Sequence, residues 1–236
     1  MRPPDTPSNS PTPGRNPLAT GDGNRPVHVP GDTPDAQELR GVLGEAGVVL
    51  DRGTGPADDS VVLVPVWGTT VAASVAEAGL PAARTLRVDP LSLPTRRRVL
   101  SMTPASDPDA VHDASAVLAR PVGTGEPPAV SVVRDTAGSI AQRLLASVVT
   151  VAASIAERGI AAPADIDLAV TLGLGYPLGP LAWGEHTGAA RMLDLHRALY
   201  ATTGDPRYRP TRWVTERAQL GLPLTEPGTP PPHTAG

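Results

Sequence analysis

Cysteine, phenylalanine and lysine do not occur in this chain, and aromatic residues make up only 3% of its 236 residues. The absence of cysteine excludes a disulfide framework, a thiolate nucleophile and a cysteine-based metal site. Because aromatic residues are so scarce, Ala, Val and Leu must fill the core. All basic side chains are Arg, a bias typical of a GC-rich genome, so a single Arg carries little functional meaning.

Positive charge is also in short supply, with a net charge of -4 at pH 7. A nucleic-acid-binding protein needs a basic face, so we expect no nucleic-acid partner. We also expect no apolar run long enough to span a bilayer. The N-terminus lacks the apolar core of a signal peptide. The default prediction is a cytoplasmic protein with no membrane contact.

Apolar residues are rare at both ends of the chain. Residues 1–35 consist mainly of Pro, Gly, Ser, Thr, Asn and Asp, and such a segment buries too little surface to offset the entropy of ordering. Residues 36–50 form one weakly amphipathic segment, followed by a Gly/Pro/Asp loop. We therefore predict a mostly disordered N-terminal tail over 1–58 and a second disordered tail over 223–236.

Residues 59–134 alternate between strand and helix patterns, with the ordered part beginning near Asp59. The continuous run from Val61 to Val66 is typical of a buried parallel strand. Further strands are predicted at 85–88, 98–102 and 129–133, and helices at 71–79 and 107–118. This alternation indicates a small parallel α/β unit.

Residues 135–222 follow a helical period instead. The apolar positions that recur at helical spacing are Ile140, Leu144, Val148, Ala152 and Ile155. They predict a long amphipathic helix that ends at Gly159. Three more helices are predicted at 163–173, 189–202 and 211–220, so this second domain is all-helical.

Four motifs follow one another in this half: Val-Arg-Asp-Thr-x-Gly at 133–138, Gly-x-x-x-Pro-x-Asp-Ile-Asp at 159–167, Gly-Leu-Gly-Tyr-Pro-x-Gly-Pro at 173–180 and Gly-Asp-Pro-Arg-Tyr-Arg-Pro at 204–210. In this order they resemble the C-terminal helical domain of 3-hydroxyacyl-CoA dehydrogenases. The resemblance implies an α+β, multidomain fold: a small degenerate Rossmann-like α/β unit followed by an all-helical dehydrogenase C-terminal-like domain.

The resemblance also implies catalytic residues that the sequence does not supply. The family oxidises 3-hydroxyacyl-CoA with NAD and uses a His held by a Glu to remove the hydroxyl proton. The His should lie just before Asp89-Pro90, where Leu86, Arg87 and Val88 stand, and Ser101 is the closest match to the Glu. Gln142 replaces an Asn of the family, and Ser139 replaces a Phe. We therefore predict no catalytic residue and keep Gln142 as the one candidate for substrate binding.

A dinucleotide-binding turn of the Gly-x-Gly-x-x-Gly type, and the strand before it, are expected to be missing. The segment Trp67-Gly68-Thr69-Thr70 follows a strand but offers only one Gly. No cofactor-binding residue is predicted, and NAD is expected only if the family activity is retained.

Together these losses lead to a hypothesis of a non-catalytic dimerisation or partner subunit. The chain resembles the degenerate second half of tandem bacterial enzymes, and its expected partner is a second copy or a catalytic 3-hydroxyacyl-CoA dehydrogenase. Two alternatives stay open. The chain could be an active or partner-completed NAD-dependent dehydrogenase, or it could be an acyl-CoA-binding or structural protein.

The remaining chemical signals are interpreted as structural. Gly173, Gly175 and Gly179 follow a helix, so they indicate a corner between packed helices rather than a phosphate loop. No metal site is predicted, because a metal needs three or four converging ligands. His186 and His196 are read as surface or helix-end residues. Arg96–Arg98 is interpreted as a solvated strand edge, with contact to CoA phosphates as the alternative. Tyr176, Tyr208 and Trp213 are expected to anchor the helical core.

Overall fold

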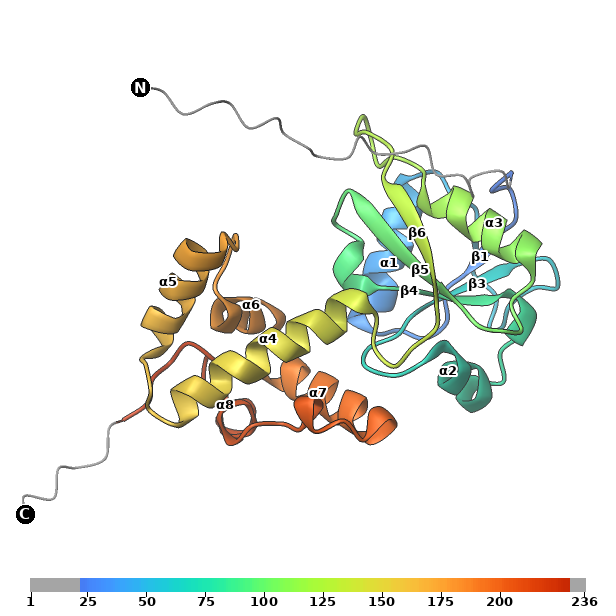
Figure 1. Cartoon of the computed structure of the whole chain (residues 1–236). Coiled ribbons are helices and arrows are strands. Elements are labelled where there is room, and N and C mark those ends of the chain that lie inside the picture. Colours follow the sequence, from blue (N-terminus) through green and yellow to red (C-terminus); the bar gives the residue numbers. More distant parts are fainter. Residues whose placement is uncertain (1–21, 230–236) are drawn as a thin grey trace, which may run out of the picture.

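The computed structural model describes residues 22–229 and contains two domains, an α/β domain and a helical domain (Figure 1). The long helix α4 (Ile140–Glu157) leads from the first domain into the second. The fold class predicted from the sequence is confirmed at this level.

The α/β domain is built on one six-stranded sheet with the order β2-β1-β3-β4-β5-β6. The strands are β1 (Val27–His28), β2 (Leu50–Asp51), β3 (Val61–Pro65), β4 (Thr85–Val88), β5 (Arg97–Met102) and β6 (Ala129–Arg134). β1 pairs in parallel with β2 and β3, and β3 with β4. β4 and β5 are antiparallel, whereas β5 and β6 are parallel.

The antiparallel pair corrects the prediction of a purely parallel unit. Only residues 89–96 connect β4 to β5. A parallel connection needs a crossover of a dozen or more residues, so this short segment returns the chain in the opposite direction. The sheet is therefore mixed.

Residues 22–58 correct the predicted domain boundary at 58/59. β1 lies between β2 and β3, and helix α1 (Pro34–Glu45) buries Leu39 and Leu43 completely. The segment is ordered because its strands pair within the sheet and its helix buries an apolar face, although its overall composition predicted disorder. The prediction for residues 1–21 falls outside the described residues.

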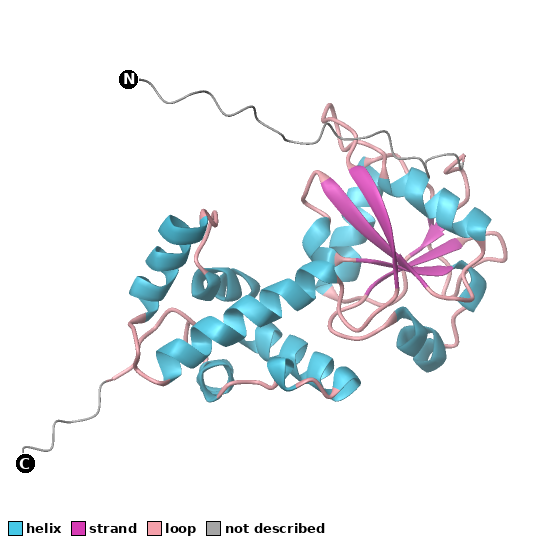
Figure 2. Cartoon of the chain, viewed as in Figure 1, coloured by secondary structure: helices cyan, strands magenta, loops and turns pink. Residues whose placement is uncertain are grey.

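Helices cover both faces of the sheet (Figure 2). α1 and α3 (Pro108–Leu118) share a core with Val61 and Leu63. The alternate residues Val62 and Val64 pack on the opposite face against α2 (Val71–Ala78). Because β3 is buried on both faces, its sequence is a continuous apolar run rather than an alternating one.

The helical domain surrounds α4, which contacts each of the other four helices. These are α5 (Pro163–Leu174), α6 (Pro180–Thr187), α7 (Ala189–Thr203) and α8 (Arg212–Leu220). The predicted helices are present, but α6 was not predicted, and α5 ends at Gly175 with φ +67° rather than at Gly173. The tail expected from residue 223 is also wrong at its start, because Leu224 is buried and its carbonyl accepts from Trp213 Nε1.

The length of α4 overturns one expectation. By length and composition alone, this helix is long and apolar enough to cross a membrane, although no apolar run of that length was predicted. One side of α4 nevertheless forms the core of the helical domain, with Leu145, Val149 and Ala153 buried. A core helix of this kind meets the same criterion.

Candidate functional site

The interface between the two domains brings together residues at or near the positions where the family has its catalytic and substrate-binding side chains. Arg87 and Ser101 face each other across β4 and β5, and Asp89 follows β4 directly. Ser139 caps α4, and Gln142 lies in its first turn. All five side chains are buried, with at most 1% of each residue exposed. We call these five residues the interface cluster.

Gln142 uses its whole amide group inside the cluster. Its Oε1 accepts from the backbone N–H of Gly68 at 2.8 Å. Its Nε2 donates to Val66 O at 3.0 Å and to Asp89 Oδ1 at 3.2 Å. Gln142 therefore joins α4 to the loop after β3, and it does not face an open cavity.

Asp89 is held from both domains. Ser139 Oγ donates to Asp89 Oδ2, and Asp89 Oδ1 also accepts from the backbone N–H of Leu91 at 3.1 Å. The carboxylate therefore serves as a structural acceptor that ties the end of β4 to the start of α4.

Arg87 carries the positive charge of the cluster. Its guanidinium donates to Ser101 Oγ and to the backbone carbonyls of Thr69 and Thr136, at 2.9 to 3.3 Å. It also pairs with Asp135 at 3.5 Å. Burial lowers the pKa of Arg87, and the nearby Asp135 opposes that shift. An Arg remains protonated under ordinary conditions, so it cannot act as a general base.

The cluster as a whole lacks what removal of a hydroxyl proton requires. It contains no His, and its one carboxylate already accepts hydrogen bonds from Ser139 and Gln142 of the helical domain and from the backbone N–H of Leu91. Its polar groups are hydrogen-bonded to one another and to nearby backbone groups, so the arrangement stabilises the interface.

The aromatic residues that were expected to anchor the helical core have structural roles. Tyr208 and Trp213 are buried in the helical core as expected, and Tyr176 packs edge-on against Trp183. Among the described residues, no group of three or more His, Cys, Asp or Glu side chains could hold a metal.

His196 corrects the prediction of a surface or helix-end histidine, since it is fully buried. Its Nδ1 donates to Met192 O at 2.7 Å, and its Nε2 lies 2.8 Å from Thr150 Oγ1 and 3.1 Å from Ala146 O. His186, in contrast, is exposed as predicted.

The arginine run corrects part of the prediction of a solvated strand edge: Arg96 and Arg97 are exposed as predicted, but Arg98 and the strand position are not. β5 is an interior strand, and Arg98 is buried. Arg98 Nη1 donates to Leu118 O at 2.8 Å, at the C-terminal end of α3. A cation in this position satisfies a free carbonyl and the negative end of the helix dipole.

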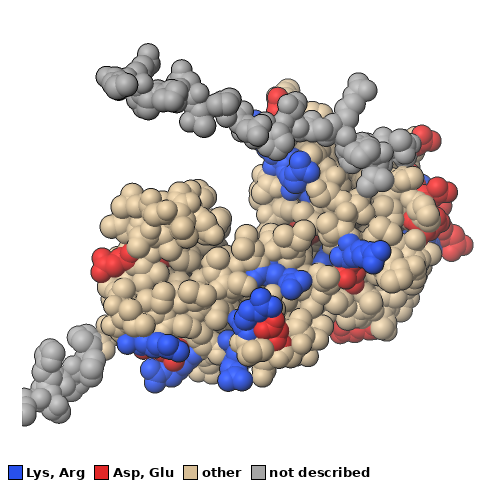
Figure 3. Space-filling model, viewed as in Figure 1, with Lys and Arg blue, Asp and Glu red and all other residues tan. Residues whose placement is uncertain are grey.

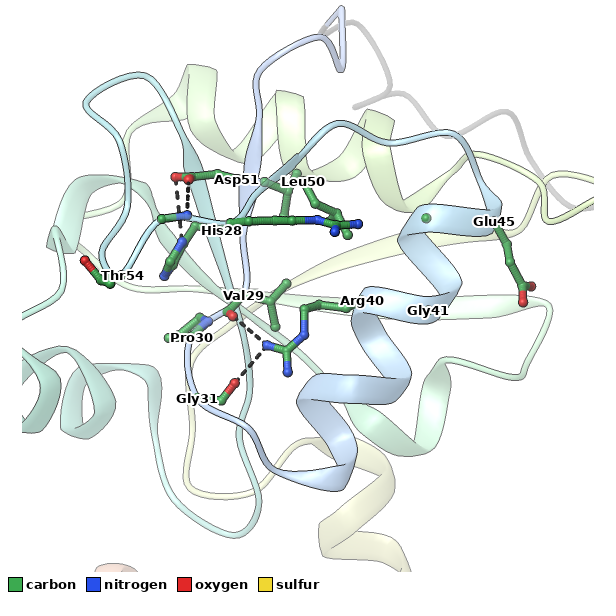
Figure 4. A pocket seen from close by; sticks show the side chains of 14 residues that line it. His28, Val29, Pro30, Gly31, Arg40, Gly41, Glu45, Leu50, Asp51 and Thr54 are labelled. Carbon is green, nitrogen blue, oxygen red and sulfur yellow. Dashed lines mark hydrogen bonds and ion pairs between the residues drawn. The ribbon is translucent and has the colours of Figure 1, made fainter.

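A separate cavity of about 780 Å³ lies at the carboxyl ends of β1 and β2 (Figure 4). It is lined by the turn after β1, which includes Gly31, and by Asp51 with the loop that follows it. In doubly wound sheets, ligands bind at the carboxyl ends of the strands, near the point where the strand order reverses, which here lies between β1 and β3.

Comparison with known proteins identifies the helical domain. A family model described as the C-terminal domain of 3-hydroxyacyl-CoA dehydrogenase matches residues 138–228. Residues 138–228 belong to this domain family.

The curated relatives match the same half of the chain. The 3-hydroxyadipyl-CoA dehydrogenase of Escherichia coli (strain K12) is 39% identical over 88 residues, which are 37% of this chain and 18% of the relative. A probable 3-hydroxybutyryl-CoA dehydrogenase of Bacillus subtilis (strain 168) is 33% identical over 89 residues, or 38% and 31% of the two chains. The matched part is thus a fifth to a third of the length of these relatives.

Solved structures extend the likeness to both domains. FadB2 of M. tuberculosis superposes with a TM-score of 0.63 at 19% identity, covering 84% of this chain and 67% of that one. The (S)-3-hydroxybutyryl-CoA dehydrogenase PaaH1 of Ralstonia eutropha gives a TM-score of 0.62 at 20% identity, covering 83% and 65%. At these identities the likeness establishes the shared fold.

The 3-hydroxyacyl-CoA dehydrogenase family uses NAD, and the turn after β1 is where a dinucleotide's pyrophosphate would meet backbone N–H groups. The strand and turn that were predicted to be missing are present, but only Gly31 remains of the glycine pattern. Thr33 Oγ1 already accepts the N–H of Ala36, Pro34 has no N–H, and Asp35 adds a negative charge.

The acid at the end of β2, which would bind the ribose in such a site, already accepts hydrogen bonds from the chain itself. Asp51, at the end of β2, accepts from Gly53 N and Ala57 N at 2.9 and 2.8 Å and from Ser60 Oγ at 2.7 Å. These hydrogen bonds, led by the backbone N–H of Ala57, lower the pKa of Asp51 to about 2. Three hydrogen bonds from the chain's own loop thus engage both oxygens of this carboxylate, which leaves it little acceptor capacity for a ribose. The residues of this cavity do not fit NAD.

Proposed function

We propose that this chain is a non-catalytic member of the 3-hydroxyacyl-CoA dehydrogenase family that acts as a dimerisation or partner subunit. One observation carries the proposal. The closest matches to the family's orienting acid and its Asn, Ser101 and Gln142, lie in the closed interface cluster with Arg87, which comes from the segment where the base is expected. Ser101 accepts from Arg87, and the Gln142 amide is hydrogen-bonded to backbone groups of the loop after β3.

The test is NADH formation by the purified chain with NAD and 3-hydroxybutyryl-CoA. A catalytic relative serves as the positive control, and circular dichroism verifies that the chain is folded. We expect no absorbance change at 340 nm above the blank. Turnover proportional to the concentration of this chain would overturn the proposal and favour the alternative of an active dehydrogenase.

The interface cluster also bears on the alternative of an acyl-CoA-binding protein. That role would need an open pocket near Gln142. Gln142 is fully buried and its amide group is paired on both sides. The filled interface supports the partner role over this alternative.

The proposed association surface lies on the helical domain. α5 and the loop after it expose Leu168, Leu172, Leu174 and Leu178, and no charged residue occurs from Leu168 to Gly184. Figure 3 shows this part of the surface as mostly uncharged. Exposed apolar patches of this kind mark interaction sites.

α4 adds a second set of exposed apolar residues, Ile140, Leu144 and Val151. A surface without charge can meet its own copy across a two-fold axis without repulsion. We therefore propose a second copy of this chain as the first partner to test, and a catalytic 3-hydroxyacyl-CoA dehydrogenase as the second.

A further inference from the structure

The first turn of α1 carries an acid that the helical domain neutralises. Asp35 follows Pro34 at the start of α1, and only 12% of its side chain is exposed. Arg191 Nη2 lies 2.6 Å from Asp35 Oδ1 and 2.7 Å from Oδ2. The two residues belong to different domains, so this ion pair crosses the interface.

Arg191 is held from a second direction by Trp67. Its guanidinium carbon lies 4.1 Å from the centroid of the Trp67 ring, and Trp67 Nε1 donates to Arg191 O at 3.1 Å. Trp67 precedes Gly68, whose added Cβ would lie 2.6 Å from Ala198 Cβ on α7. The loop after β3 therefore packs closely on α7 where Arg191 reaches across.

The position of Arg191 on α7 is unfavourable for a cation without a partner. Arg191 lies in the first turn of α7. A cation there is disfavoured by the positive end of the helix dipole, whereas an anion at the start of α1 is favoured. Asp35 compensates the charge that α7 by itself would disfavour.

We infer that Asp35 and Arg191 form an internal replacement for a dinucleotide. The carboxylate of Asp35 takes the anionic position at the start of α1, and Arg191 binds it, so the two domains are fastened without a cofactor. This inference concerns the domain interface and stands separately from the proposed partner role.

The first test is a double-mutant cycle on thermal stability with Asp35→Asn, Arg191→Gln and the double variant. We expect each single variant to lower the melting temperature by about 2–4 °C. The double variant should fall no further than the larger single effect, because both changes remove one interaction.

Asp109→Asn is the matched control for this cycle. Asp109 also follows a Pro in the first turn of a helix, but it is exposed. We expect it to shift the melting temperature by less than the Asp35 variant does. Fully additive effects of the Asp35 and Arg191 variants, or an equal effect of Asp109→Asn, would overturn the inference.

The second test asks whether Asp35 takes the place of a phosphate. We expect inorganic pyrophosphate to raise the melting temperature of Asp35→Asn, in which Arg191 has lost its partner. The wild-type chain and the double variant should not respond, and NADH should show no saturable fluorescence change with the wild type. An equal pyrophosphate response of the wild type, no response of Asp35→Asn, or saturable NADH binding by the wild type would overturn the inference.

Discussion

At the residue scale, Asp167 explains why the corner between α5 and α6 needs a glycine. Its two carboxylate oxygens accept from Leu181 N and Ala182 N, both at 2.8 Å, and so cap the start of α6. A Cβ added at Gly179 would lie 2.6 Å from Asp167 Cα, a distance that no real contact tolerates. The sequence motif therefore encodes a close approach between helices.

Gly179→Ala should accordingly lower the free energy of unfolding by about 3 kcal/mol, because the backbone at Asp167 cannot yield without losing the cap. Urea denaturation followed by circular dichroism measures this change. Gly173→Ala is the matched control, since nothing lies within 4 Å of its added Cβ. A helical Gly→Ala change of that kind should be neutral or stabilising by up to about 1 kcal/mol. Equal effects of the two variants would refute the close-packing argument.

The buried side chain of His196 should make the stability of the protein depend on pH. Burial lowers its pKa, although the contacts with Met192 O and Ala146 O oppose the shift. The unfolded chain takes up a proton near pH 6.5, whereas the folded chain does so only at lower pH. Stability should therefore be full above about pH 6.5 and fall below it, by at most about 1.4 kcal/mol per pH unit.

The prediction is that His196→Gln removes this part of the pH dependence. His186→Gln, the same substitution at an exposed position, is the matched control. Urea titrations between pH 5 and pH 8 measure the slopes. A wild-type slope that persists in the His196 variant would assign the proton uptake to another group.

At the scale of the elements, sequence patterns predicted the structure where apolar residues follow a clear period. The run at β3 and the helical spacing along α4 are long enough to carry such a signal. β1 and β2 have two paired residues each, so no period can be read from them. These two strands form because they pair within a sheet whose other strands lie far along the chain.

The candidate site was only partly predictable for a similar reason. Motif order located Asp89, Ser101, Ser139 and Gln142 as matches to family positions, and it placed the expected base only within the segment 86–88. Their mutual hydrogen bonds depend on how the two domains pack, which no local spacing encodes. The pairing of Asp35 with Arg191 gave no sequence signal at all, because the two are separated by most of the ordered chain.

At the same scale, the exposed apolar surface of α5 is predicted to mediate dimerisation. Leu172→Glu places a charge at the centre of its apolar surface, where 77% of the native residue is exposed. We expect the chain to elute as a dimer and this variant as a monomer in size-exclusion chromatography with light scattering, because burying an unpaired charge in an interface is costly.

Leu220→Glu on α8 is the control, since Leu220 is 69% exposed but lies on another helix. It should leave the mass unchanged. A wild-type chain that is monomeric at all concentrations would exclude the homodimer and direct the search to a catalytic partner.

At the scale of the whole molecule, the interface cluster decides whether the two domains unfold together. Gln142 bridges them through Gly68, Val66 and Asp89. Truncating its amide leaves a buried N–H, a buried carbonyl and part of a carboxylate without this partner. Each such loss is more costly than the net gain from a hydrogen bond that is made.

Gln142→Leu should therefore lower the free energy of unfolding by about 3 kcal/mol and weaken the coupling between domains. Urea unfolding can be followed by circular dichroism, which reports both domains, and by Trp fluorescence, to which Trp183 and Trp213 in the helical domain contribute. We expect the two transitions to coincide in the wild type and to separate in the variant. Gln37→Leu, the same substitution at an exposed position of α1, should keep them coincident. If Gln142→Leu also unfolds in one transition with unchanged stability, the domains are held by other contacts, and Gln142 would again be a candidate for a role in ligand binding.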